Sequence, residues 1–222
     1  MDKVYFVGDT HGEWNQIFDV VDRYELYNIR LIHVGDIGIG FGSVGEEIHI
    51  EQFESLNGSF KSRGIEFLGI RGNHDNPKYF DGSVSLNHFR LLSDYHTEEI
   101  NGEKFLFIGG AISIDRSFRT EGICYWKEEA IKHPLQELQP ADVIVAHDAP
   151  IYAGLPITGL YNEPGNPVRD DSEKGRAILG KVVEKVQPKR FVHGHYHISL
   201  FNKIDGTLFR GLDIAEFSEY RV

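Results

Sequence analysis

The sequence predicts an α/β fold built around parallel β-sheet. Short apolar runs of strand length alternate with segments whose apolar residues recur at helical spacing, which is typical of βαβ units. The middle of the chain has several short strands separated by turn residues, and no linker or internal repeat divides the sequence. We therefore expect one domain with two sheets, residues 1–222.

The N-terminal part of the chain alternates strands and helices. Three short apolar runs that end at or just before a glycine predict buried strands at Lys3–Gly8, Ile29–Gly35 and Glu66–Arg71. Between them, apolar residues three or four positions apart predict helices at Trp14–Tyr24 and Glu46–Phe60.

The rest of the chain mixes short strands with two further helices. The expected strands are Phe89–Leu92, His96–Ile100, Lys104–Gly109, Val143–His147, Phe191–Gly194, Ser199–Ile204 and Thr207–Leu212. Helices are expected at Glu128–Leu138, broken near Pro134, and at Ser172–Val186. The dipeptide Asp205-Gly206 favours a tight primed turn and so predicts a hairpin between the last two strands.

Residues 150–171 differ from the rest, because they hold four of the eight prolines and show little periodicity. A segment of this length without predicted structure is usually a functional loop or a disordered one. Since it follows directly after His147, we expect it to form a rim that selects substrates. A loop without functional consequence is the alternative.

Composition excludes several classes of protein. With 23 Lys and Arg against 34 Asp and Glu, the formal charge is −11, and such a surface disfavours broad non-specific nucleic-acid binding. No stretch approaches 18 consecutive apolar residues, and a strand-like run begins at once, so neither a membrane span nor a signal peptide is expected. The single cysteine, Cys124, has apolar neighbours that favour packing over a catalytic thiol. These features predict a cytoplasmic protein.

Five clusters of polar residues each follow a predicted buried strand. They are Gly8-Asp9-Thr10-His11-Gly12, Gly35-Asp36, Gly72-Asn73-His74-Asp75, His147 and Gly194-His195-Tyr196-His197. Random sequence of this composition would contain Gly-His-x-His about 0.06 times and Gly-Asn-His-acid about 0.008 times, so the clusters are not chance matches. Ligand sites in α/β sheets collect outside the carboxyl ends of strands, and we expect these clusters to meet in one crevice.

The residue types in these clusters point to bound metal ions. Imidazole and carboxylate ligands without thiolate suit Mn, Fe or Zn. Asp9 and His11 can point the same way, as can His195 and His197, and Asp36 is the carboxylate best placed to bridge two cations. Two ions roughly 3.5–4 Å apart would clamp a phosphate and activate a bridging water. Such a centre keeps a positive charge and attracts phosphate esters even in an acidic protein.

The five clusters resemble the pattern of the calcineurin-like metallophosphoesterase superfamily, D-x-H, G-D, G-N-H-D/E, a lone H and G-H-x-H, across residues 8–197. The resemblance implies a four-layer α/β/β/α sandwich with two mixed β-sheets. It implies two divalent ions, the first held by Asp9, His11, Asp36 and His197. The implied ligands of the second ion are Asp36, Asn73, His147 and His195.

The resemblance also implies two catalytic residues. His74 would contact the substrate and protonate the leaving oxygen, with Asp75 orienting it, while a hydroxide bridging the ions attacks phosphorus in line. A histidine that titrates near neutral pH suits this acid role.

The departures from the pattern concern substrate class. Asp36 is followed by Ile-Gly-Ile-Gly-Phe-Gly, so the Asp-Arg-Gly of the superfamily's protein phosphatases is absent, although Arg71-Gly72-Asn73-His74 resembles their R-G-N-H-E. The C-terminal Gly-His-x-His is similar to the phosphodiesterase and nuclease branches. We expect hydrolysis of small phosphomonoesters or phosphodiesters, including nucleotides. Phosphoprotein dephosphorylation is the alternative, and a non-catalytic scaffold is less favoured because every ligand position is intact.

Other residues have two possible roles. Arg116 and Arg119 could donate to a substrate phosphate, or form ion pairs with Asp115 or Glu121. His33 and His193 lie in apolar strands, where a core position is the simpler interpretation and support of a metal ligand is the other. Asp148 could orient His147 or only shape a turn.

Overall fold

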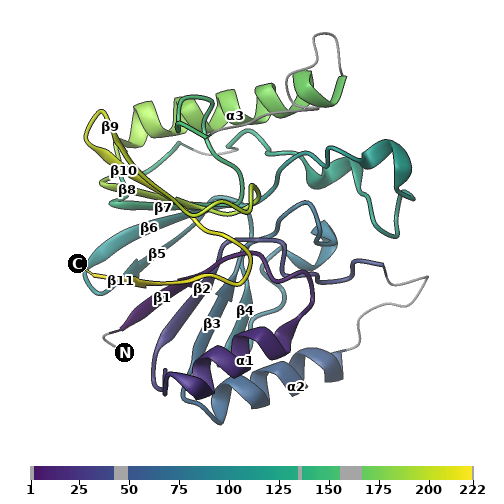
Figure 1. Cartoon of the computed structure of the whole chain (residues 1–222), viewed down its shortest axis with the longest axis vertical. Helices are drawn as coiled ribbons and strands as arrows, with labels where there is room; N and C mark the ends of the chain where they lie inside the picture. Colours follow the sequence, from purple (N-terminus) through teal and green to yellow (C-terminus); the bar gives the residue numbers. More distant parts are fainter. Residues whose placement is uncertain (1–2, 43–49, 135–136, 156–166, 222) are drawn as a thin grey trace.

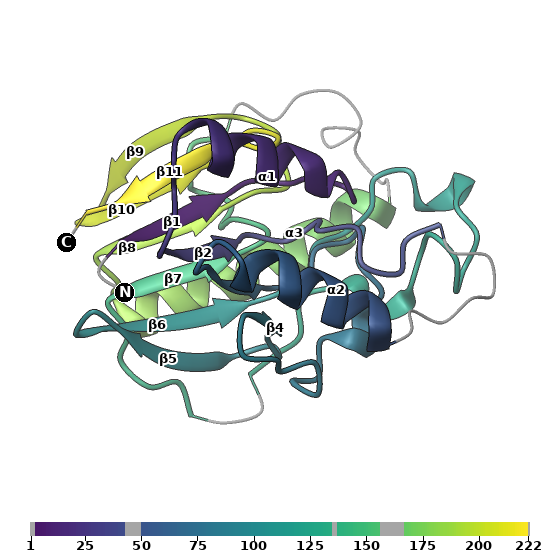
Figure 2. The ribbon, with the colours of Figure 1, turned by 90° about the horizontal axis from the view of Figure 1, so that it is seen from below.

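Two β-sheets lie face to face with helices on their outer faces, so the chain forms four layers in the order α/β/β/α (Figure 1). The computed structural model describes residues 3–42, 50–134, 137–155 and 167–221. The helices are α1 (Trp14–Arg23), α2 (Ile50–Lys61) and α3 (Pro167–Val186). Helices α1 and α2 cover the first sheet, as Figure 2 shows from below, and α3 covers the second. The predicted α/β fold with two mixed sheets is confirmed.

The first sheet positions three of the polar clusters. In spatial order its strands are β11 (Phe217–Tyr220), β1 (Val4–Val7), β2 (Arg30–His33), β3 (Glu66–Gly69) and β4 (Phe89–Leu91). Strands β1 to β4 are parallel, and β11 is antiparallel to β1. Val7 is paired with His33, and His33 with Gly69, so β1, β2 and β3 end side by side. The segments that follow them therefore leave the sheet at one edge.

The second sheet positions the other two clusters. In spatial order its strands are β5 (His96–Ile100), β6 (Glu103–Ile108), β7 (Val143–Ala146), β8 (Arg190–His193), β10 (Thr207–Gly211) and β9 (Leu200–Ile204). The four inner strands are parallel, and β5 and β9 are antiparallel to their neighbours. Val145 is paired with Val192, so β7 and β8 also end together. Asp205 and Gly206 have φ angles of 49° and 90°, which agrees with the predicted primed turn.

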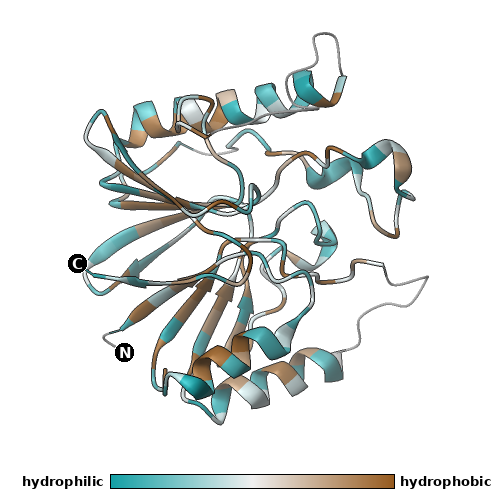
Figure 3. Ribbon diagram, viewed as in Figure 1, coloured by the Kyte–Doolittle hydropathy of each residue, from teal (hydrophilic) through white to brown (hydrophobic). Residues whose placement is uncertain are grey.

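Both faces of each sheet are covered by apolar side chains. On β1, Val4 and Phe6 belong to the layer between the sheets, whereas Val7 packs with Ile17 and Val21 of α1. Figure 3 shows hydrophobic residues along much of the strands, while the helices carry both kinds of residue. Burial on both faces explains why the strands are uninterrupted apolar runs in the sequence. Among the described residues, no helix combines the length and the apolar character needed to cross a bilayer.

Among the residues that the structure describes, one helix predicted from the sequence is largely absent. The helix expected at Glu128–Leu138 is only a 3-10 turn at Lys127–Glu129, and the described residues after it have no helical structure. The carbonyls of Glu128, Glu129 and Ala130 accept hydrogen bonds from the buried guanidinium of Arg71, so they are not used along a helix. Residues 135–136 lie outside the described part of the chain.

The proline-rich segment is shorter than predicted. Helix α3 begins at Pro167, so the last five residues of the expected 150–171 loop are helical. Proline suits the first turn of a helix, because its missing N–H has no partner there and its φ is already helical. Residues 150–155 have no regular structure, and residues 156–166 lie outside the described part. The same holds for residues 46–49 of the helix expected at Glu46–Phe60.

Candidate metal centre

The polar clusters meet where the carboxyl ends of the two sheets come together. Three sets of side chains each bring their ligand atoms within 4.8 Å of one another. The sets are Asp9, His11 and His197; His11, Asp36 and His74; and Asp36, His147 and His195. His11 and Asp36 are each shared between two sets and so connect the three sets into one cluster. Six of the seven predicted metal ligands are therefore in one place.

The seventh predicted ligand, Asn73, lies beside His147. Its Oδ1 is 3.2 Å from Nε2 of His147, and the same nitrogen is 3.2 Å from Oδ1 of Asp36. The other ring nitrogen of His147 lies 2.9 Å from the carbonyl oxygen of Val34, which fixes the ring. The structure thus brings all seven predicted ligands together.

The donor atoms fit a divalent cation. Nε2 of His11 and Nε2 of His197 lie 3.2 Å apart, and the His197 nitrogen lies 3.2 Å from Oδ2 of Asp9. At least one of two facing ring nitrogens must present a lone pair to the other. Converging imidazole nitrogens and carboxylate oxygens are the ligand set that borderline divalent ions prefer. The residues present therefore suit Mn²⁺, Fe²⁺ or Zn²⁺.

The buried charges also favour a cation here. Burial raises the pKa of Asp9. Burial opposes ionisation of the Asp36–His147 pair as well, but mutual attraction outweighs it, lowering the pKa of Asp36 and raising that of His147 to about 10. A proton on His147 balances the Asp36 carboxylate in this arrangement. A divalent cation can take over that role.

Four candidate ligands have strained backbone. The φ angles of His11, Asp36, His195 and His197 are 49°, 54°, 68° and 51°, in the left-handed region that non-glycine residues seldom adopt. Each such residue costs on the order of 1–3 kcal/mol and persists where the surroundings impose it, most often at functional sites.

Two glycines of the motifs allow the close approach of the ligands. A side-chain carbon at Gly72 would overlap the carboxylate of Asp36, and one at Gly194 would overlap that of Asp9. The glycines that precede Asn73 and His195 are therefore required by space.

A family model described as calcineurin-like phosphoesterase matches residues 2–199. The chain belongs to this family. The enzyme is therefore a hydrolase of phosphoric ester bonds, as the sequence motifs predicted. Comparison with curated proteins gives no match.

Solved structures share the fold at low sequence identity. An archaeal phosphodiesterase is 13% identical, with a TM-score of 0.50 over 98% of each chain. Protein TT1561 of Thermus thermophilus is 12% identical, with a TM-score of 0.55 over 97% of each chain. A candidate 5′-nucleotidase of Staphylococcus aureus is 14% identical, with a TM-score of 0.51 over 98% of this chain and 50% of that one.

In this phosphoesterase His74 is held between an aromatic ring and an arginine. Its ring stacks on Phe41 with centroids 4.5 Å apart, and its backbone N–H donates to Oδ1 of Asp36 at 2.7 Å. Nη2 of Arg119 lies 2.8 Å from Nε2 of His74. A guanidinium can only donate, so this nitrogen of His74 accepts. Burial, together with the charge of Arg119, lowers the pKa of His74 to about 4.

Asp75 has a different role from the predicted one. Its carboxylate does not serve to orient His74, because backbone N–H groups at 2.7–3.2 Å occupy both of its oxygens. The donors are Ile37, Gly38, Ile39 and Gly72. Asp75 therefore joins the loop after β2 to the loop after β3. Burial raises the pKa of this carboxyl to about 6.

The two candidate substrate arginines point to different places. A pocket of about 380 Å³ opens over the centre, lined by Asp36, Asn73, His74, Ile114, Asp115, Arg119, His195, Tyr196 and His197. Arg119 lies in its wall and also pairs with Asp115 at 2.7 Å. Arg116 instead donates to Asp171 of α3 at 2.7 Å. Arg116 is thus paired with α3 and is not among the residues that line this pocket, so its contact with substrate stays a prediction.

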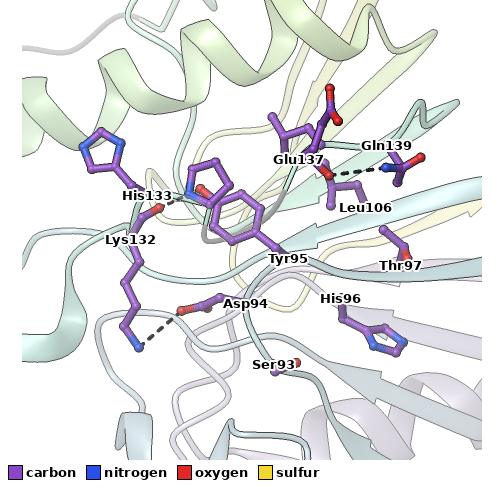
Figure 4. Close-up of a pocket in the computed structure, with 12 residues that line it drawn as sticks. Ser93, Asp94, Tyr95, His96, Thr97, Leu106, Lys132, His133, Glu137 and Gln139 are labelled. Atoms are coloured by element: carbon purple, nitrogen blue, oxygen red, sulfur yellow. Dashed lines mark hydrogen bonds and ion pairs between the residues drawn. The ribbon is translucent and has the colours of Figure 1, made fainter.

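Arg71 is a structural residue despite its place in the Arg-Gly-Asn-His run. It is 1% exposed and donates to both carboxylate oxygens of Asp94 at 2.9–3.3 Å. Asp94 borders a second pocket, of about 310 Å³, outside the metal centre (Figure 4). There Asp94 also pairs with Lys132 at 3.5 Å, and the Tyr95 hydroxyl donates to the Lys132 carbonyl at 2.6 Å.

The ambiguous residues have distinct contacts. Nε2 of His33 lies 2.9 Å from the hydroxyl of Thr10, the residue between Asp9 and His11 in the sequence. Asp148 accepts from the Tyr196 hydroxyl and so joins the loop after β7 to the loop after β8. It does not orient His147, whose ring is held by a backbone carbonyl. Nδ1 of His193 lies 3.1 Å from the carbonyl of the next residue, Gly194.

Sequence reasoning missed two buried residues beside the centre, Ser113 and Glu129. The Ser113 hydroxyl lies 3.1 Å from Nδ2 of Asn73 and 2.6 Å from Oε2 of Glu129. Neither residue belongs to a motif, and Glu129 lies in the wrongly predicted helix. Only the folded chain reveals their position.

Proposed function

We propose that this phosphoesterase hydrolyses small phosphomonoesters or phosphodiesters, nucleotides among them, at a centre of two divalent cations. The observation that supports it best is the position of Asp36, which belongs to two of the three ligand sets. A carboxylate shared between two sets is the feature that a two-ion centre requires. Mn²⁺, Fe²⁺ or Zn²⁺ fits the ligand types.

The proposed ligands divide into two sets around this shared carboxylate. The first ion would be held by Asp9, His11 and His197, which form one set, together with Asp36, which shares a second set with His11. The second would be held by Asp36, Asn73, His147 and His195. Bound ions would supply Lewis-acid activation of a phosphate oxygen and of a water nucleophile.

The chain itself would bind the phosphate and supply a proton. Arg119 lies in the pocket wall and can present forked donors to phosphate oxygens. In the structure it donates to Nε2 of His74, so that nitrogen carries no proton. A bound phosphate that draws Arg119 away would free Nε2 of His74 to hold a proton and pass it to the leaving oxygen.

The site supports small substrates. A pocket of about 380 Å³ accommodates a compact ester, since small-molecule pockets usually measure about 300–1,000 Å³. The formal charge of −11 works against long duplex nucleic acid. The archaeal phosphodiesterase of the same fold makes diesters the first class to test.

The test is metal-dependent hydrolysis by protein that has been stripped with a chelator and reloaded with Mn²⁺, Fe²⁺ or Zn²⁺. We expect turnover of p-nitrophenyl phosphate or its bis ester, and then of mononucleotides, cyclic nucleotides or dinucleoside polyphosphates. Asp36→Asn should lose more than the roughly 10–100-fold typical of changes behind a metal ligand. Asp19→Asn, on the exposed side of α1, is the matched control and should be unchanged.

Two results would contradict the proposal. Inactivity with every metal would indicate a non-catalytic scaffold. A phosphopeptide hydrolysed far better than every small ester would indicate a phosphoprotein phosphatase.

A further inference from the structure

Ser113 lies between the metal centre and a buried carboxylate. Its Oγ is 2.6 Å from Oε2 of Glu129, 3.1 Å from Nδ2 of Asn73 and 3.0 Å from Nη1 of Arg119. A serine hydroxyl has one proton to donate and two lone pairs with which to accept. Three partners therefore use its full capacity.

The direction of each hydrogen bond is determined by the partners. Nδ2 of Asn73 and the guanidinium of Arg119 can only donate, so they take the two lone pairs of Ser113. The hydroxyl proton must then point at Glu129, whose ionised carboxylate only accepts. Glu129 thus sets the orientation of the Ser113 hydroxyl.

This orientation decides which way the Asn73 amide faces. With Nδ2 bound to Ser113, Oδ1 faces Nε2 of His147 at 3.2 Å. The flipped amide would place its oxygen against Ser113 lone pairs, because the hydroxyl proton is already used by Glu129. The amide oxygen, which can ligate a cation, is therefore held on the side of the centre.

Glu129 is itself firmly held. The backbone N–H of Ser113 donates to its Oε1 at 2.9 Å, and its own carbonyl accepts from Arg71 at 2.7 Å and from the N–H of Ala111 at 3.1 Å. The side chain is almost fully buried, at 1% exposure. Because both its carboxylate and its backbone carbonyl are held, Glu129 can impose one orientation on the Ser113 hydroxyl.

We propose that Ser113 and Glu129 are positioning residues that aim the Asn73 amide oxygen at the metal centre and hold Arg119 in the substrate pocket. The inference rests on the proposed metal centre. Residues behind metal ligands typically change metal affinity by about 10–100-fold when they are replaced. Affinity for metal is therefore the readout, separate from catalysis.

The experiment titrates chelator-stripped protein with Mn²⁺ by calorimetry at pH 8, above the pKa of Glu129, which burial raises to about 6. Ser113→Ala should weaken one of the two Mn²⁺ sites by about 10–100-fold and leave the other within about threefold. Ser113→Thr keeps the hydroxyl and should restore the affinity. Glu129→Gln offers one acceptor oxygen in place of two, so its Mn²⁺ affinity should lie between those of Ser113→Ala and Ser113→Thr. Ser172→Ala, a buried serine of α3, is the matched control and should bind as the wild type does.

The outcomes distinguish the two proposals. Wild-type protein that binds no Mn²⁺ overturns the metal centre and this inference together. Wild-type protein that binds two ions, with Ser113→Ala unchanged, overturns only the inference, as does Ser113→Thr binding as weakly as Ser113→Ala. Thermal unfolding of each variant distinguishes loss of a site from loss of the fold. If Ser113→Ala does not fold, Glu129→Gln decides the question, because an Mn²⁺ affinity equal to that of the wild type overturns the inference.

Discussion

Replacing Arg71 by methionine keeps most of the buried volume and removes the guanidinium. The side chain is 1% exposed, and the change leaves Asp94, itself 13% exposed, without its main partner. Three carbonyls, those of Glu128, Glu129 and Ala130, also lose their donor. Breaking a buried ion pair from one side costs about 3–5 kcal/mol. We therefore expect Arg71→Met to lower the free energy of unfolding by about that amount.

In a chain of this size, 1 kcal/mol corresponds to roughly 2–4 °C in Tm, so the midpoint should fall by about 10 °C. Urea unfolding followed by circular dichroism measures the free energy directly. Arg63→Met is the matched control: Arg63 pairs with Asp22 at the surface, where the side chains are 23% and 46% exposed, and its loss should cost under about 1 kcal/mol. Equal losses in the two variants would refute the structural role of Arg71.

Three further predictions concern the pH dependence of stability, the two arginines near the substrate pocket, and the close packing at Gly194. Hydrogen bonds, that from His96 foremost, lower the pKa of Glu98 to about 2, so its contribution of roughly 1–2 kcal/mol is fully present above about pH 4.5 and lost as pH falls through 2. Glu98→Gln should therefore be less stable than wild type at pH 7 in urea unfolding, and the difference should shrink as pH falls from 4.5 through 2. Arg119→Ala should lower kcat/KM for p-nitrophenyl phosphate by about 10–100-fold, while Arg116→Ala leaves it within about twofold, and equal effects would contradict the geometry. Gly194→Ala should abolish tight Mn²⁺ binding in calorimetry, because its methyl group overlaps a ligand carboxylate, and unchanged binding would contradict that overlap.

The sequence revealed the central strands and the candidate ligands for one physical reason. Strands buried on both faces must be apolar throughout, so the polar residues that follow them are conspicuous. Where a parallel sheet ends, those residues share one edge, which made the meeting of Asp9, Asp36 and Asn73 predictable.

Features that depend on distant contacts could not be predicted. Strand β11, Phe217–Tyr220, is a short edge strand that exists because β1 offers it a partner. Arg116 and Arg119 would share a face on a longer helix, but the turn ends at Phe118 and Arg119 is extended, with φ −103° and ψ 157°. The two side chains therefore diverge, and the spacing of the two arginines in the sequence does not reveal this.

Electron paramagnetic resonance of protein loaded with two equivalents of Mn²⁺ would reveal whether two ions share the Asp36 carboxylate. Two ions that share Asp36 would lie about 3.5–4 Å apart and couple magnetically. We expect an exchange-coupled spectrum for the wild type, and its loss in Asp36→Asn but not in Asp19→Asn. A spectrum of isolated Mn²⁺ ions at full loading of the wild-type protein would contradict it.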